Sequence, residues 1–363
     1  MFGEHIGAWI LQEWTIAGKP KSFEYLELGP GRGTLAKDAL NAIQTLLDKV
    51  DDDKKTMINV RFVEVSPVLS KKQAETLDLK ITEVSEVEAD GCYMKASNGS
   101  NISAEWYRSF ETLPESNDIS FSICNEFFDA LPIHQFDFNE NTRQWREVIV
   151  DTDPVDKEKL RFVTAPGDTP AAKALLPMFD NDDLEGKRRV EVSPSSLIHC
   201  QWLCERIMKQ GGSSLIIDYG HEGQKEDTLR GFKNHKLVEV LDNPGDIDIT
   251  ADVNFSHLRS VAEAIGVDAS ESITQDAFLK NMGIETRLLM LMRATISAPA
   301  RKNLSECFDY LMKEMGPKFR VMALSHPARQ KSGEQIPGFY KLQQDHSAFM
   351  RAPPKMDIEG DLK

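Results

Sequence analysis

A glycine-rich turn between a buried strand and a helix constrains the fold of this chain more than any other feature. Residues 22–28 (SFEYLEL) have the apolar character of a buried strand, and residues 29–33 (GPGRG) follow at once. Residues 34–47 then repeat apolar side chains at helical spacing. After an acidic loop at 51–55, residues 59–65 (NVRFVEV) predict a second strand, and another helix follows. This order predicts an α/β protein with a doubly wound parallel sheet.

The glycine-rich turn also has the features of a ligand site. Glycines let the backbone approach a ligand closely, and a helix N-terminus offers unpaired N–H donors. A dinucleotide site reads G-x-G-x-x-G, whereas Gly29, Gly31 and Gly33 have the spacing G-x-G-x-G. The alternative is a tight turn without a ligand, which the entropy cost of three glycines disfavours.

Two carboxylates near this turn indicate the kind of ligand. Glu27 lies two residues before the first glycine, and a carboxylate at this position is badly placed for a pyrophosphate. It suits a ligand with a positive amine, such as the methionine part of S-adenosylmethionine. Glu64 ends the next predicted strand, 64 − 33 = 31 residues after the last glycine, and can accept both ribose hydroxyls of an adenosine ligand. A dinucleotide fold has its acidic residue only about 20 residues on.

A second candidate site follows a strand predicted at 119–124. Residues 125–132 (NEFFDALP) place two carboxylates, Glu126 and Asp129, and two aromatic rings at the carboxyl end of that strand. Open α/β sheets keep reactive groups at this edge. An arginine guanidinium fits such a pocket, because it stays charged and stacks on aromatic rings. The residues are equally consistent with the alternative, in which both phenylalanines belong to the core and Asp129 caps a turn.

Histidine and cysteine offer weaker signals. His221 follows a strand predicted at 213–218 and could act as a base near neutral pH, although a structural role is the more common one. Cys200 and Cys204 resemble half of a metal site, but zinc needs three or four ligands, and no second pair lies at ligand spacing. We therefore expect two half-buried cysteines on one helical face and no metal.

Charge and hydropathy disfavour two classes of function. The chain has 43 Lys and Arg against 58 Asp and Glu, a net charge of −15 that repels phosphates. We therefore expect no nucleic-acid partner. No apolar run reaches the roughly 18–20 residues of a membrane span, so we expect no membrane insertion.

The remaining segments predict additions to one α/β core. Residues 89–118 are rich in Gly, Asn and Ser and predict a loop. The expected division is a core over 1–255 with a surface insertion at about 151–189, a helical accessory segment over 256–316, a last core strand within 317–345, and a flexible tail over 346–363.

Several segments together resemble a known family. In chain order they are ELGPGRGTL (27–35), VEVS (63–66), NEFFDALPIH (125–134), VEVSP (190–194), LIIDYGH (215–221), DTLRGFKNHKL (227–237), DITADVNF (248–255) and FLKNMGI (278–284). They resemble the MidA-type protein arginine methyltransferases over residues 1 to about 345. NEFFDALP together with TADV and DYGH is more specific to that family than the glycine motif. The animal member of the family is a mitochondrial assembly factor of respiratory complex I (NADH:ubiquinone oxidoreductase).

The resemblance implies a fold, an activity and a place. The fold is a class I S-adenosylmethionine-dependent methyltransferase (Rossmann-like doubly wound sheet) with inserted, mostly helical segments. The activity is type II, symmetric dimethylation of an arginine on a core subunit of complex I, needed for assembly or stability of that complex. The place is the mitochondrial matrix, with the presequence not present in this chain. The alternative is a non-catalytic, methyltransferase-like assembly chaperone.

The resemblance also assigns residues. By motif match, S-adenosyl-L-methionine is bound by Glu27, Gly29, Gly31 and Gly33, with Glu64 on its ribose, while Glu126 and Asp129 face the substrate. This chain departs from the family in two ways. It starts just after an upstream Gly-Asp-Phe-x-Thr-x-Pro stretch, and it has Asn125 where the animal member has His.

Overall fold

The computed structural model describes residues 1–50, 56–85, 91–179, 184–234, 236–242 and 244–340. The predicted acidic loop at 51–55 and the predicted tail at 346–363 lie outside the described residues. No helix in the described ranges has both the length and the apolar character needed to cross a membrane.

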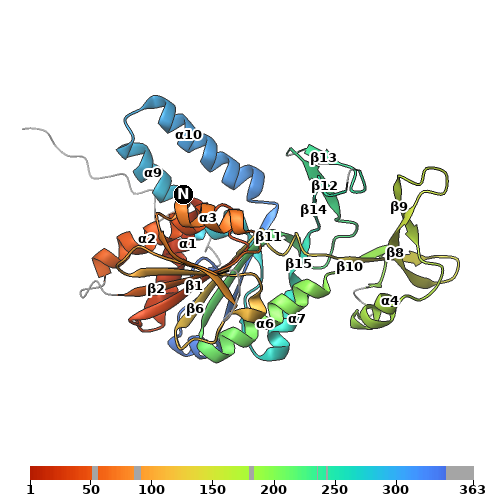
Figure 1. Cartoon of the computed structure of the whole chain (residues 1–363), viewed down its shortest axis with the longest axis horizontal. Coiled ribbons are helices and arrows are strands. Elements are labelled where there is room, and N and C mark those ends of the chain that lie inside the picture. Colours follow the sequence, from red (N-terminus) through yellow and green to blue (C-terminus); the bar gives the residue numbers. More distant parts are fainter. Residues whose placement is uncertain (51–55, 86–90, 180–183, 235, 243, 341–363) are drawn as a thin grey trace, which may run out of the picture.

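A large sheet whose central strands are parallel forms the centre of the molecule (Figure 1), which confirms the predicted fold class. Its strands run in the order β16-β18-β11-β6-β1-β2-β5-β4-β3, with β15 beside β11 and β17 beside β18. The pairs β1–β2, β1–β6, β6–β11 and β2–β5 are parallel, and β18 is antiparallel to β11. The strands are β1 (Ser22–Leu28), β2 (Met57–Val63), β3 (Lys80–Val84), β4 (Cys92–Ser97), β5 (Ile102–Tyr107), β6 (Ile119–Asn125), β11 (Gly212–His221), β15 (Val253–Asn254), β16 (Asp268–Ala269), β17 (Ile273–Thr274) and β18 (Phe319–Ser325).

Helices cover both faces of this sheet because the buried side chains of its strands alternate. From β1, Phe23 and Tyr25 enter a core with α1 (Phe2–Ile16), α2 (Thr34–Val50) and α8 (Gln275–Asn281), whereas Leu26 and Leu28 enter a second core. The second core contains α6 (Pro194–Gln210), whose two cysteines are fully buried, and α7 (Phe255–Ile265). Further helical segments are α3 (Pro67–Thr76), η1 (Phe110–Thr112), α4 (Pro170–Leu175), η2 (Leu176–Met178), α9 (Ile284–Ala294), α10 (Ala298–Asp309), η3 (Tyr310–Met315, a π-helix) and η4 (Pro327–Ser332).

Two small sheets project from the core (Figure 1). The first has the order β10-β7-β8-β9 and packs on α4. The segment predicted as a surface insertion, 151–189, contributes β9 and α4 to this unit, which begins earlier, at β7. The second has the order β13-β12-β14. Their strands are β7 (His134–Asn139), β8 (Gln144–Thr152), β9 (Leu160–Thr164), β10 (Arg189–Val192), β12 (Arg230–Lys233), β13 (Lys236–Val238) and β14 (Asp248–Thr250).

The predicted loop at 89–118 is wrong, because this segment contains β4 and β5. Its polar residues make the hairpin turn between the two strands. Gly99 adopts a left-handed φ of +75°, and the Asn98 side chain accepts hydrogen bonds from the backbone N–H groups of Ser100 and Ile102. Gly and Asn are typical of tight turns, so the Gly and Asn content of this segment indicates the turn and gives no sign of the strands on either side of it.

The chain order of the parallel strands reverses at β1. From β1 the chain continues to β2 on one side, and it returns later as β6 on the other side. Open α/β sheets bind ligands at such a switch point, outside the carboxyl ends of the strands. Both sequence motifs lie there, because residues 29–33 follow β1 and residues 126–132 follow β6.

Candidate active site

The three glycines after β1 all have left-handed backbone conformations, with φ of +66° at Gly29, +53° at Gly31 and +76° at Gly33. A Cβ added to Gly29 would lie 3.1 Å from Phe127 Cδ2, and one added to Gly33 would lie 3.2 Å from the Cα of Gln73. A Cβ on Gly31 would meet no atom within 4 Å. The outer glycines therefore allow close packing, and the middle one leaves its backbone open to a ligand.

A glutamine on α3 ties the glycine turn to the predicted ribose ligand. Gln73 Nε2 donates to the carbonyl of Gly31 at 2.7 Å and to Glu64 Oε2 at 2.9 Å. Its Oε1 accepts the indole N–H of Trp106 at 2.7 Å. Glu64, 7% exposed, also accepts the backbone N–H of Ser66 at 2.8 Å. Glu64 and the turn thus belong to one hydrogen-bonded unit.

The other predicted cofactor carboxylate, Glu27, is buried at the end of β1. It accepts a hydrogen bond of 2.7 Å from the Tyr25 hydroxyl. Burial raises the pKa of Glu27 to about 7, since the charged form loses its hydration. A cationic group beside Glu27 would lower that pKa again, so this position suits the amine of S-adenosylmethionine.

The turn after β6 is held in place by a residue far away in the sequence. Asp218, fully buried on β11, accepts the backbone N–H groups of residues 127, 128 and 129 with Oδ2 at 3.1, 2.9 and 3.3 Å. Glu126 has a left-handed φ of +50°, and its N–H donates to the carbonyl of Ile217 at 3.0 Å. This turn conformation places Glu126 at the surface and Asp129 in a buried position.

The two carboxylates of this turn influence each other. Burial and the charge of Glu126 raise the pKa of Asp129 to about 6, against the opposing effects of the Ala130 N–H and Arg230. Partial loss of hydration also raises the pKa of Glu126, although it keeps access to solvent, and a hydrogen bond from Asn125 opposes that rise. Burial and the Asp129 charge raise the pKa of Asp218. Hydrogen bonds from four backbone N–H groups oppose this rise in part.

The two phenylalanines of the turn have different environments. Phe128 is 2% exposed and belongs to the second core, as the structural alternative predicts. Phe127 is half-buried, lies against Gly29 and packs on His199 with ring centroids 5.2 Å apart. Phe127 therefore joins the acidic turn after β6 to the glycine turn after β1.

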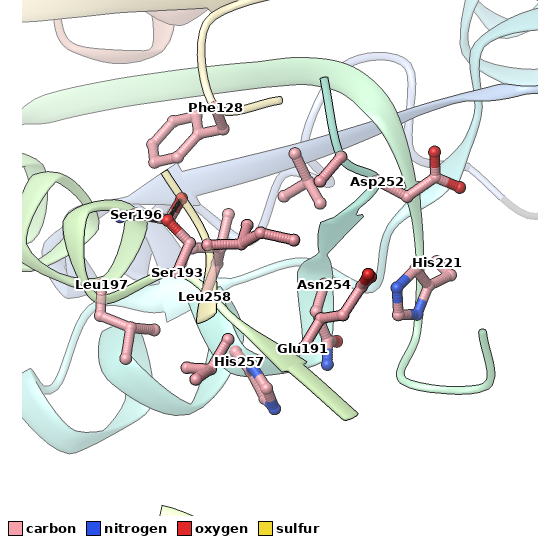
Figure 2. A pocket seen from close by; sticks show the side chains of 14 residues that line it. Phe128, Glu191, Ser193, Ser196, Leu197, His221, Asp252, Asn254, His257 and Leu258 are labelled. Carbon is pink, nitrogen blue, oxygen red and sulfur yellow. Dashed lines mark hydrogen bonds between the residues drawn. The ribbon is translucent and has the colours of Figure 1, made fainter. Parts of the chain in front are cut away.

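His221 is the last residue of β11. Its Nδ1 accepts the backbone N–H of Gly223 at 2.9 Å, and burial lowers its pKa to about 4. It lines a cavity of about 30 Å³ together with Phe128, Asp252 and Asn254 (Figure 2). That volume holds about one water molecule. An imidazole that is neutral at pH 7 and enclosed in this way favours the structural role over that of a base.

Several residues of this site escaped prediction. Gln73 has no local signal, because its role depends on three partners from different elements. Trp106 lies in the segment predicted as a loop. Asp218 belongs to the motif DYGH, in which the sequence indicates His221, and not Asp218, as a candidate site residue. Among the described residues there is no group of three or more His, Cys, Asp and Glu placed to hold a metal ion.

Comparison with known proteins decides the family. A family model described as "Putative S-adenosyl-L-methionine-dependent methyltransferase" matches residues 5–273. Protein arginine methyltransferase NDUFAF7 of Homo sapiens is 42% identical over 335 residues, which are 92% of this chain and 73% of that protein. This chain belongs to that family. The NDUFAF7 protein of Xenopus tropicalis is 40% identical over 350 residues, and the homologue of Drosophila melanogaster 35% over 333 residues. All three are named mitochondrial.

Solved structures agree with the methyltransferase fold. A crystal structure of an uncharacterised protein from Burkholderia thailandensis has a TM-score of 0.70 at 22% identity and covers 93% of this chain and 80% of its own. A second crystal structure from Burkholderia thailandensis, of a likely methyl transferase bound to S-adenosyl-homocysteine, has a TM-score of 0.66 at 22% identity and covers 90% of this chain and 76% of its own. At this identity the likeness shows the fold alone.

Family membership makes S-adenosyl-L-methionine the cofactor and methyl transfer the reaction of this methyltransferase. The site described above fits that cofactor. The open backbone at Gly31 can receive a ligand, Glu64 offers carboxylate oxygens at the end of β2, and Glu27 lies buried where a positive amine would be favourable.

Proposed function

We propose that this methyltransferase methylates arginine side chains of a protein, with Glu126 and Asp129 on the substrate side. One observation carries the proposal: the acidic turn contacts the glycine turn through Phe127 and Gly29. A guanidinium held by the two carboxylates would then lie beside the bound cofactor. The names of the relatives, which are protein arginine methyltransferases, support this substrate class.

The acidic pair would solve the main chemical difficulty of arginine methylation. A guanidinium is a poor nucleophile, because its nitrogen lone pairs are delocalised. Two carboxylates can localise the positive charge on two nitrogens and leave the third free to attack. The bound cofactor supplies a methyl group on a sulfonium. The chain must align the attacking nitrogen and keep water out. Asp129, with its pKa near 6, is suited to accept the proton that the methylated nitrogen releases.

We further propose the substrate and the place that the sequence resemblance implies. The substrate is an arginine on a core subunit of complex I, the product is symmetric dimethylarginine, and the compartment is the mitochondrial matrix. In this role methylation supports assembly or stability of the complex. The rival function is a non-catalytic chaperone that binds the same subunit through a methyltransferase-like fold.

Mass spectrometry tests the proposal on the purified chain, with S-adenosylmethionine and the isolated partner subunit. We expect methylated arginine with the wild-type chain, and a loss of at least about 100-fold in rate for Glu126→Gln and Asp129→Asn. Both variants should keep their affinity for S-adenosyl-homocysteine. Wild-type turnover in both variants would refute the role of the acidic pair. Binding of the subunit without any methylated product would support the chaperone.

A further inference from the structure

An arginine of the projecting β12–β14 sheet lies close to the acidic turn. Arg230, the first residue of β12, donates from Nη2 to Asp252 Oδ1. Its guanidinium carbon lies 5.6 Å from the ring centroid of Tyr219 on β11. Its Nε is buried and has no hydrogen-bond partner among the described residues. The cation is therefore fixed in place by a carboxylate and a ring, and its buried Nε–H is unpaired within the described part of the chain.

Asp252 connects this arginine to the acidic turn. Its side chain is 2% exposed, and its other oxygen, Oδ2, pairs with Lys225. The backbone N–H of the preceding residue, Ala251, donates to the carbonyl of Asp129 at 3.0 Å. Figure 2 shows Asp252 beside His221 at one end of the small cavity that Phe128 also lines. Arg230 is thus tied, through Asp252, to the segment that contacts the backbone of Asp129.

The charged and titratable groups around Asp129 come from several elements. Its own turn contributes Glu126, β11 contributes Asp218 and Tyr219, the segment before β15 contributes Asp252, and β12 contributes Arg230. Of these groups, Arg230 supplies the positive charge. Without it, burial and three neighbouring carboxylates would all favour the neutral form of Asp129.

We propose that Arg230 is a positioning residue that keeps Asp129 ionised, so that Asp129 and Glu126 together can receive a cationic side chain. This inference rests on the proposed function of the pair. The Arg230 guanidinium would then stay beside the acidic pair both before and after a second cation, the substrate guanidinium, binds there. The acidic pair and Arg230 then act as one electrostatic unit assembled from the turn after β6 and from β12.

A purely structural role for Arg230 makes a different prediction. In that case Arg230 would only tie β12 to Asp252, and removing Lys225, which binds the same carboxylate, would have the same effect. Lys225 has no such contact with the Tyr219 ring, so Lys225→Gln is the matched control. Arg230→Lys keeps the charge, whereas Arg230→Gln and Arg230→Met remove it; methionine retains an apolar stem over Tyr219.

The first experiment records the rate of arginine methylation against pH for these variants. We expect the acidic limb of Arg230→Gln and Arg230→Met to move up by about one pH unit, since a charged neighbour typically shifts a carboxyl group by that amount. Arg230→Lys should restore the wild-type limb, and Lys225→Gln should leave it in place. An unmoved limb in both neutral variants, or an equal shift in Lys225→Gln, would overturn the proposal.

The second experiment needs no activity. Carboxyl ¹³C NMR of the full chain, with Asp129 assigned through Asp129→Asn, gives the titration of Asp129 in wild type and in both neutral variants. We expect the same upward shift of about one unit. If the shift occurs but wild type makes no methylarginine, the proposed function fails and the role of Arg230 stands. If wild type methylates arginine and Asp129 titrates identically in all variants, the role of Arg230 fails alone.

Discussion

The glycine turn and the acidic turn are neighbours in space, but they are built in different ways. The glycine turn depends on backbone conformation, with three left-handed residues in a stretch of five, and on a glutamine from α3. The acidic turn depends on a buried carboxylate, Asp218, about 90 residues later in the chain, and on the charges of Arg230 and Asp252 from still more distant segments. The turn proposed to bind the cofactor is therefore shaped mainly by its own backbone, and the turn proposed to face the substrate mainly by long-range electrostatics.

The largest effect should come from removing Asp218. Asp218→Ala leaves three backbone N–H groups of the acidic turn without their acceptor, so we expect the free energy of unfolding to fall by about 3 kcal/mol. Asp218→Asn keeps an oxygen acceptor and should lose less. Urea denaturation measures both. Equal stability of wild type and Asp218→Ala would mean that the acidic turn supports itself, and the contrast between the two turns would disappear.

Alanine at two glycines should separate packing from ligand access. Both substitutions strain a left-handed residue by about 1–2 kcal/mol. The new methyl group of Gly29→Ala also pushes against Phe127, so this variant should lose further stability. The methyl group of Gly31→Ala meets no atom of the described residues within 4 Å, so this variant should chiefly weaken S-adenosyl-homocysteine binding, by at least about tenfold. Thermal unfolding and calorimetry give the two values. Equal losses of stability would contradict the packing contrast between these positions.

Substitution of Glu64 should weaken cofactor binding and leave the acidic turn unchanged. Glu64→Ala removes the carboxylate that we assign to the ribose, and we expect about tenfold weaker binding of S-adenosyl-homocysteine by calorimetry. The fold should persist, as circular dichroism can verify. Glu126→Gln, in the acidic turn, is the matched control and should bind the cofactor product like wild type. An unchanged affinity in Glu64→Ala refutes the ribose role.

The smallest effect concerns a proton at Glu27. The pKa of this group is raised to about 7, so it holds a proton below that pH in the folded chain. A cationic amine bound beside it lowers the pKa, so binding at about pH 6.5 should release a fraction of one proton, and none well above about pH 8. Calorimetry in buffers of different ionisation enthalpy detects the release. Glu27→Gln should abolish it; the same release in that variant would assign the proton to another group.

The same contrast explains which parts were predictable from the sequence. The glycine turn, Glu27 and Glu64 lie within or directly after strands with clear apolar patterns, so local reasoning places them together. Asp218 and Gln73 acquire their roles only through contacts with distant elements, which no spacing reveals. The strands β4 and β5 were missed because the polar residues of their hairpin turn dominate the composition of that segment.

The first helix and the segment after the last strand are also joined. On α1, Glu13 accepts two-pronged hydrogen bonds from Arg329 of η4 at 2.6–3.0 Å, and a further one of 2.8 Å from Ser213 on β11. Glu13 is 3% exposed, so this clasp is inside the protein. It closes a loop of more than 300 residues, a closure whose entropy cost grows only slowly with length. Proteolytic trimming at either side of the clasp would leave a buried charge unpaired and so loosen the opposite side as well.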